Sequence, residues 1–260
     1  MVDLQSQYTF IRSQVEAGIN EVLSTAQFIN GPAVKSFQSN LESYLGVKHV
    51  IPCANGTDAL QVAMMGLGLE PGDEVITADF TFAATVEVIA LLGLTPVLVD
   101  VDPNSFNIEP NAIVRAITPK TKAIVPVHLF GQVADMDAIM AIAEKHNLYV
   151  IEDNAQGIGA THTSSNGNTT KTGGIGHVGS TSFFPSKNLG CYGDGGAIFT
   201  NDDDLAHTLR GIVNHGMYER YHHDVVGVNS RLDSLQAVVL NEKLKLLDYY
   251  NERRKWAAIR

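Results

Sequence analysis

The chain has only two cysteines in 260 residues, Cys53 and Cys191, and little positive charge. Two cysteines cannot build the disulfide framework of a small secreted domain. The 18 Lys and Arg residues against 28 Asp and Glu residues give a formal net charge of −10, which is the wrong sign for a nucleic-acid-binding surface. No apolar run is long enough to cross a bilayer, and no signal-peptide pattern opens the sequence. We therefore expect a cytoplasmic protein without nucleic-acid or membrane partners.

Nine histidines are present, but their spacing does not predict a metal site. The most suggestive cluster is His222-His223, where adjacent side chains diverge and no Cys or carboxylate stands at the spacing that zinc requires. His128 follows an apolar strand-like run, and a hydrogen-bonded structural histidine is the favoured interpretation there. We expect no bound metal.

The sequence does contain a regular alternation of helical and strand-like patterns. Amphipathic stretches at 11–23 and 34–45 come first, and a helix is predicted to begin at the acids of 201–204. Apolar strand-like runs lie at 47–52, 74–77, 96–101, 123–127, 148–152 and 196–200. Such alternation is typical of a mostly parallel sheet covered by helices. We expect an α/β fold, and the 45% of hydrophobic residues can fill its core.

Lys187 stands in an unusual setting, after a strand-like run that ends in Phe183-Phe184-Pro185-Ser186 and directly before a turn that contains Gly190. Most lysines are solvated surface charges. A lysine whose surroundings favour loss of its proton is a covalent catalyst instead, and its usual product is a Schiff base with a carbonyl compound or with pyridoxal phosphate. Three upstream segments favour the catalytic interpretation.

The first segment is Asn55-Gly56-Thr57, between a strand-like run and a helical pattern. A glycine at such a turn lets backbone amides approach an anion, and the helix N-terminus favours negative charge. Gly56 and Thr57 are therefore candidate phosphate-binding residues. The alternative is an ordinary helix N-cap that binds nothing, and the segment alone does not separate the two.

The second segment is the apolar run at 148–151, which ends in Glu152-Asp153-Asn154-Ala155-Gln156. Ligand groups of open α/β sheets collect at the carboxyl ends of strands. A carboxylate there can pair with the protonated pyridine nitrogen of pyridoxal phosphate and keep the ring an electron sink. Asp153 is the candidate for this role, and Gln156 is the candidate for a contact with the ring hydroxyl. The alternative is that Glu152 and Asp153 cap the segment that follows.

The third segment, Asp79-Phe80-Thr81-Phe82, follows the strand-like run at 74–77. An aromatic side chain at a strand end can lie flat on a cofactor ring, because offset stacking adds to the energy of burial. Phe82 is the candidate for this contact. Plain core packing is the alternative for an aromatic residue in this position.

Together these segments resemble the DegT/DnrJ/EryC1/StrS family of nucleotide-sugar aminotransferases, and the resemblance covers nearly the whole chain. The matching motifs are Asn55-Gly56-Thr57-Asp58-Ala59-Leu60, Thr81-Phe82-Ala83-Ala84-Thr85, Glu152-Asp153-Asn154-Ala155-Gln156, Ser182-Phe183-Phe184-Pro185-Ser186-Lys187 and Gly193-Asp194-Gly195-Gly196. The resemblance implies an aspartate aminotransferase-like fold (fold type I), pyridoxal 5'-phosphate as cofactor and a homodimer. The residue roles that it implies are Lys187 bonded to the cofactor, Asp153 on the pyridine nitrogen, Gln156 on the ring oxygen, Phe82 on the ring face, Ser182 on the phosphate and Asn229 on the neighbouring subunit's phosphate.

The segments at 220–223 and 227–233 look closest to the branch of the family that makes 3-amino uronic acid sugars, the UDP-2-acetamido-2-deoxy-3-oxo-glucuronate aminotransferases. This resemblance implies an amino-acid donor, glutamate, and a role in polysaccharide precursor synthesis such as that of lipopolysaccharide O-antigen. Arg231 is a candidate partner of the sugar carboxylate or phosphate, because a guanidinium binds either anion through two parallel bonds. His215 either lines the substrate cleft or belongs to a helix C-terminus before Gly216.

Two other functions stay open at this point. One is a transaminase of the same family that acts on another dTDP- or GDP-linked keto-hexose. The other is a non-catalytic regulator that binds pyridoxal phosphate. The joint presence of Lys187, Asp153, Gln156 and Ser182 speaks against the regulator, because a sensor has less need of a proton shuttle.

The sequence departs from the family pattern in two places. Residues 161–174 are longer and more polar than expected and predict a surface loop that leaves the site untouched. The family also continues for on the order of 100 residues beyond Arg260, which is about one small domain. We therefore expect a fragment, with a cofactor-binding large domain at 1–230 and a long connector helix at 231–260 that leads to a small domain absent from this chain.

Overall fold

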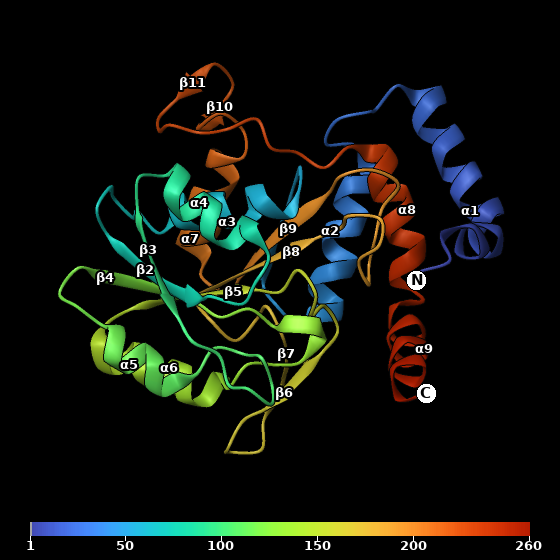
Figure 1. The fold of residues 1–260 in the computed structure, drawn as a ribbon. Coiled ribbons are helices and arrows are strands. Elements are labelled where there is room, and N and C mark those ends of the chain that lie inside the picture. Colours follow the sequence, from blue (N-terminus) through green and yellow to red (C-terminus); the bar gives the residue numbers. More distant parts are fainter. Residues whose placement is uncertain (1) are drawn as a thin grey trace.

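The computed structural model describes residues 2–260 and shows a central sheet with helices on both faces (Figure 1). The strands of this sheet are β1 (His49–Cys53), β2 (Glu74–Ala78), β3 (Thr95–Val99), β4 (Thr121–Val125), β5 (Tyr149–Asp153), β8 (Val178–Ser182) and β9 (Gly196–Thr200). The helices are α1 (Leu4–Thr25), α2 (Pro32–Leu45), α3 (Gly56–Gly66), α4 (Ala83–Leu91), α5 (Pro110–Ala116), α6 (Met136–His146), α7 (Asp203–Ile212), α8 (Ser234–Leu244) and α9 (Leu247–Ile259), with a 3-10 turn, η1, at Leu129–Gly131. Two small hairpins are formed by β6 (Thr161–Thr163) with β7 (Thr169–Lys171) and by β10 (Met217–Glu219) with β11 (His222–His223).

The seven strands of the main sheet lie in the order β1-β9-β8-β5-β4-β2-β3. Neighbouring strands from β8 to β3 are parallel, whereas β9 runs antiparallel to both β8 and β1. The carboxyl ends of β2, β4, β5 and β8 therefore open on the same edge of the sheet, where α/β folds collect ligand groups. The expected mostly parallel sheet is confirmed.

Both faces of the sheet are buried, which explains why its strands read as continuous apolar runs. Adjacent residues of a strand point to opposite faces. Ile151 and Ile198 pack in one cluster with residues of α3, α4 and α7. On the opposite face Val150 packs with α5 and α6, and Phe199 packs with α2 and α8. None of the helices within residues 2–260 combines the length and the apolar character that crossing a membrane requires.

The segment expected to be a surface loop contains the β6–β7 hairpin. Threonines face each other across its strands, and the hydroxyl oxygens of Thr163 and Thr169 lie 3.1 Å apart. At the turn the Gly167 N–H donates to the Ser164 carbonyl over 2.8 Å, with Gly167 in the left-handed region at φ 87° that favours glycine. The hairpin from 163 to 170 is mostly exposed, as expected, and its β-branched side chains give it strand structure. The expectation that the whole segment leaves the site untouched is wrong, because Thr161 lines the same cavity as Lys187 and Thr172 is fully buried.

The prediction of one long helix after residue 230 is wrong, because α8 and α9 are separate helices. Leu246 leaves helical geometry at φ −111° and ψ 1°, and its N–H bonds the Lys243 carbonyl, which closes the end of α8. This break lets Leu244 and Leu247 both enter the core cluster that α8 shares with α2. Helix α8 also contacts α1, whereas α9 continues beyond it at the side of the molecule (Figure 1). The domain boundary near residue 230 stays a prediction.

Candidate active site

Lys187 lies in the loop 183–195, which connects the carboxyl end of β8 to β9. The Phe183 N–H donates to the Gly195 carbonyl over 2.7 Å and closes the base of this loop. The Lys187 N–H donates to the Phe184 carbonyl over 2.9 Å, so a turn places the lysine. The loop begins at the sheet edge that the topology assigns to ligands.

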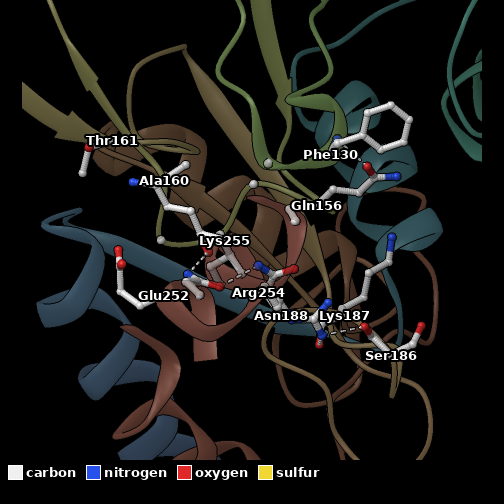
Figure 2. A pocket seen from close by; sticks show the side chains of 16 residues that line it. Phe130, Gln156, Ala160, Thr161, Ser186, Lys187, Asn188, Glu252, Arg254 and Lys255 are labelled. Carbon is white, nitrogen blue, oxygen red and sulfur yellow. Dashed lines mark hydrogen bonds between the residues drawn. The ribbon is translucent and has the colours of Figure 1, made fainter. Parts of the chain in front are cut away.

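The Lys187 side chain reaches a cavity of about 830 Å³, and in Figure 2 it extends toward Gln156. Burial lowers the pKa of Lys187, because the ammonium loses hydration, while the Asp153 carboxylate acts in the opposite direction. A lowered pKa enlarges the fraction of neutral amine near neutral pH, and the neutral amine is the nucleophile. This is the property that covalent attachment to an aldehyde requires.

Asp153 is the last residue of β5, and its side chain is buried. The Thr85 hydroxyl donates to Asp153 Oδ2 over 2.8 Å, and the Ala155 N–H donates to Oδ1 over 3.1 Å. Thr85 lies in the first turn of α4 and is fully buried. These two donors fix the direction of a carboxylate that is close enough to Lys187 to influence its pKa.

The neighbouring acid, Glu152, is a structural residue. Its fully buried carboxylate accepts three backbone N–H bonds from 173–176 at 2.7–2.8 Å and one from His128 Nε2 at 2.9 Å. His128 Nδ1 accepts the Ala134 N–H, so Nε2 carries the proton and the imidazole is neutral. Burial raises the pKa of Glu152, but the His128 and backbone donors outweigh it and leave the pKa lowered. The interpretation of His128 as a hydrogen-bonded structural histidine is confirmed.

The start of α3 and the end of β8 meet at Gly56 and Ser182. A Cβ added to Gly56 would lie 2.6 Å from the Ser182 Cβ, so this contact requires glycine. Asn55 is the N-cap of α3 and accepts the Asp58 N–H over 2.8 Å. The cap does not exclude an anion, because the N–H groups of Gly56 and Thr57 have no acceptors within the helix. The Ser182 hydroxyl oxygen accepts a hydrogen bond from the Phe184 N–H over 3.3 Å. The hydroxyl proton therefore stays available to donate to a ligand.

Phe82 and Phe130 are among the exposed aromatic residues near this edge. Phe82 immediately precedes α4 and is 71% exposed, which contradicts the plain-core alternative for it. Phe130 is 72% exposed and lies beside Gln156 in Figure 2, and its N–H donates to Gln156 Oε1 over 2.7 Å. An uncovered ring such as that of Phe82 is available to stack on a flat ligand.

Of the predicted site residues, Lys187 and Gln156 line this cavity, whereas the remaining eight do not: Gly56, Thr57, Phe82, Asp153, Ser182, His215, Asn229 and Arg231. His215 is exposed, in the left-handed region at φ 61°, and lies beyond the end of α7. Asn229 is also exposed and pairs through its backbone with Asn214. Asn229 does not cap the helix that follows it, because Asp233 is the N-cap of α8. Arg231 lines a separate cavity of about 250 Å³.

The sequence did not reveal the part of α9 that lines the Lys187 cavity. Asn251 and Arg254 both face it and both bond to the loop that holds the lysine. Neither residue stands in a recognisable motif, because their partners lie more than 60 positions away in the chain. Thr85 is the last residue of the family motif at 81–85, but only the structure shows its hydrogen bond to Asp153.

The chemistry of these side chains fits pyridoxal 5'-phosphate. Lys187 offers an amine of lowered pKa to an aldehyde, and Asp153 offers a fixed carboxylate to a pyridine nitrogen. Phe82 offers an uncovered ring face. Gly56 and Ser182 meet at a helix N-terminus, which suits a phosphate.

A mostly parallel sheet with such a lysine and such an aspartate at one edge is the arrangement of an enzyme that depends on pyridoxal phosphate. The sequence model of the DegT/DnrJ/EryC1/StrS aminotransferase family matches residues 10–259. The chain belongs to this family, and pyridoxal phosphate is its cofactor.

Three similar proteins span the chain almost completely. The chain is 53% identical over 247 residues to the UDP-2-acetamido-2-deoxy-3-oxo-D-glucuronate aminotransferase of Pseudomonas aeruginosa, covering 95% of this chain and 67% of that protein. It is 50% identical over 259 residues to a pleiotropic regulatory protein of Geobacillus stearothermophilus, covering 99% and 68%. It is 48% identical over 258 residues to the UDP-N-acetyl-3-dehydro-alpha-D-glucosamine 3-aminotransferase of Acidithiobacillus ferrooxidans, covering 99% and 69%.

A solved structure gives the same result for the fold. DesV of S. venezuelae, determined in complex with a ketimine intermediate, matches with a TM-score of 0.93 and 40% identity. The match covers 99% of this chain and 68% of that one. The chain thus spans about two thirds of the length of its relatives.

Thr85→Val removes the hydroxyl that donates to Asp153 and keeps the shape of the buried side chain. We expect the free energy of unfolding to fall by about 1–3 kcal/mol, because a buried carboxylate loses one donor. Urea unfolding of the cofactor-free protein measures the change. Thr77→Val is the matched control, since the Thr77 hydroxyl is equally buried but donates to a neutral acceptor, the Val125 carbonyl, over 2.9 Å. Similar small losses in both variants would contradict the role of Thr85.

Proposed function

We propose that the chain transfers an amino group from glutamate to the 3-keto carbon of UDP-2-acetamido-2-deoxy-3-oxo-glucuronate. The observation that carries the proposal is the cavity in which the Lys187 amine, with its lowered pKa, stands within electrostatic reach of Asp153. Identity of 53% to an aminotransferase named for this sugar supports the choice of substrate. The relative named as a 3-aminotransferase of a dehydro-glucosamine nucleotide supports amination at carbon 3.

Each residue at the sheet edge has a role in this reaction. Pyridoxal phosphate, when bound, supplies an electron sink for the charge that develops at the donor's α-carbon. Lys187 would hold the cofactor through Nζ, and as a free amine the same Nζ would move the proton from the donor's α-carbon to the cofactor's aldehyde carbon. With the sugar bound, the same amine would move a proton from that cofactor carbon to the sugar carbon that receives nitrogen. Asp153, held by Thr85, keeps the pyridine nitrogen protonated.

Other residues position the cofactor. Gly56, Thr57 and Ser182 hold its phosphate at the N-terminus of α3. Gln156 Oε1 already accepts the Phe130 N–H, so its amide Nε2 is the group left to donate to the ring oxygen. Phe82 covers one face of the ring. These assignments give each polar group of the cofactor a partner.

We also propose a homodimer in which each active site is shared by two subunits. Asn229 and His215 are exposed, and Arg231 lines a cavity separate from that of Lys187. Ser230 anchors this segment to α3, because its hydroxyl donates to Asp58 Oδ2 over 2.7 Å. A two-fold axis would repeat any donation of these residues at both sites. In this arrangement Asn229 bonds the neighbour's cofactor phosphate, and Arg231 and His215 bind the neighbour's substrate.

Mixed dimers test this sharing. Lys187→Ala and Asn229→Ala subunits, each nearly inactive alone, should regain activity when they are co-expressed, because one site of each mixed dimer keeps both residues. Co-purification of differently tagged subunits proves that mixed dimers form. Absence of recovery in proven mixed dimers would place Asn229 in the site of its own subunit.

A regulatory function is the alternative from a different class, and one relative at 50% identity carries the name of a pleiotropic regulatory protein. The structure of the site favours catalysis, because Lys187, Asp153 and Gln156 supply a proton shuttle and its supports that ligand binding alone does not use. We further propose that the reaction takes place in the cytoplasm and supplies a precursor of a cell-surface polysaccharide such as O-antigen.

The substrate assignment predicts selectivity for a carboxylated sugar. With glutamate as donor, 2-oxoglutarate release should be at least roughly 10-fold more efficient in kcat/KM with the 3-oxo-glucuronate nucleotide than with the neutral UDP-N-acetyl-3-dehydro-glucosamine, which equals about 1.4 kcal/mol. Arg231→Lys should lower kcat/KM for the uronate more than for the neutral sugar, since lysine cannot bind a carboxylate bidentately. Arg220→Lys is the matched control. Better turnover of the neutral sugar, or of a dTDP-linked 4-keto-hexose, would contradict this assignment.

A further inference from the structure

Helix α9 is hydrogen-bonded to the backbone of the loop 183–195 at the position of Lys187. Arg254 Nη2 donates to the Ser186 carbonyl over 3.0 Å and to the Lys187 carbonyl over 3.3 Å. Arg254 is half-buried at the wall of the cavity, and Figure 2 shows it between α9 and Ser186. One guanidinium nitrogen thus fixes the peptide groups on both sides of the Lys187 α-carbon.

Asn251, one helical turn earlier on α9, joins this loop to a second segment of the site. Its Oδ1 accepts a hydrogen bond from the side-chain Nδ2 of Asn188 over 2.6 Å, and its Nδ2 donates to the Ile158 carbonyl over 3.1 Å. Ile158 belongs to the chain that follows Asp153 and Gln156 after β5. A single side chain therefore sets the spacing between the lysine loop and the segment that carries the aspartate and the glutamine.

The hydrogen bonds from α8 to this loop lie further from Lys187 along the chain. On α8, Lys243 Nζ donates to the Gly190 carbonyl over 2.7 Å, and Gln236 Oε1 accepts the Tyr192 N–H over 2.8 Å. These bonds secure the part of the loop that returns to β9. Across residues 2–260, the bonds to the carbonyls of Ser186 and Lys187 come from Arg254.

We propose that Arg254 and Asn251 are positioning residues that hold the Lys187 amine at the cavity wall. This inference rests on the proposed role of Lys187 in the reaction. A lysine side chain has many rotamers, so its amine reaches a fixed point only if its backbone is fixed. Arg254 supplies donors to that backbone, and its charge is not itself required, because the acceptors are neutral carbonyls.

Arg254→Met and Arg254→Lys test whether Arg254 acts by donating hydrogen bonds to the loop backbone. Arg254→Met removes the donors and lets the loop move, so the Lys187 amine becomes better hydrated and its pKa rises toward the ordinary lysine value. Arg254→Lys keeps a donor and should preserve the lowered pKa. Arg253→Met is the matched control, because Arg253 is exposed on the same helix and packs over Trp256.

The first measurement uses cofactor-free protein. Acetic anhydride labelling of Lys187 across pH, read by peptide mass spectrometry, gives the pKa of the amine directly. The second uses the holoenzyme, where Arg254→Met should lower kcat roughly 10-fold or more and change KM for the amino donor less than about two-fold, as expected for misplaced chemistry. Arg254→Lys should restore most of kcat.

Asn251→Ala provides an independent variant in case Arg254→Met does not fold, with Arg253→Ala as its control, because Arg253 is exposed and does not line the cavity. It should shift the Lys187 pKa in the same direction and lower kcat. Folded Arg254→Met and Asn251→Ala proteins with the pKa and kcat of their controls would overturn the proposal. A wild-type holoenzyme that does not transaminate would instead overturn the proposed function, so the two failures are distinguishable.

Discussion

Partial burial of the Lys187 amine is the constraint on which the rest of the site depends. A fully solvated lysine keeps its proton at neutral pH and is a poor nucleophile, whereas a fully buried one cannot reach a ligand. The loop 183–195 meets both requirements by leaving the sheet at β8, turning at Lys187 and returning to β9. The Asp153 carboxylate opposes the effect of burial on the pKa, so the fold balances two influences on one amine.

Two adjacent acids at the end of β5 have different roles, because one is structural and the other faces the site. Glu152 and Asp153 point to opposite faces, as successive residues of a strand must. Glu152 is satisfied by His128 and by the backbone of 173–176 and ties β5 to the chain before β8. This network leaves Asp153 as the carboxylate at the lysine's edge, with Thr85 and Ala155 fixing its direction.

Local sequence predicted the elements well, because each strand is a short apolar run and each loop motif lies at a strand end. The strand-like run at 196–200 and the helix after the acids of 201–204 both appear as expected. Contacts between distant segments were not predictable from one sequence. Thr85 meets Asp153 across 68 positions, and Asn251 meets Ile158 across 93. The break between α8 and α9 depends likewise on burial of Leu247 against α2, which helical periodicity alone does not reveal.

The central claim is that Lys187 is the amine that bonds the cofactor. A second lysine of lowered pKa, Lys243, serves as the comparison within the same chain. Lys243 is also buried, and burial lowers its pKa to about 8, but its ammonium is engaged with the Gly190 carbonyl and the Tyr192 ring. The decisive measurement is borohydride reduction of the protein with pyridoxal phosphate, followed by peptide mass spectrometry. The account predicts a phosphopyridoxyl group on Lys187 and none on Lys243. A label on Lys243 or another lysine, or no label with excess cofactor, would contradict it.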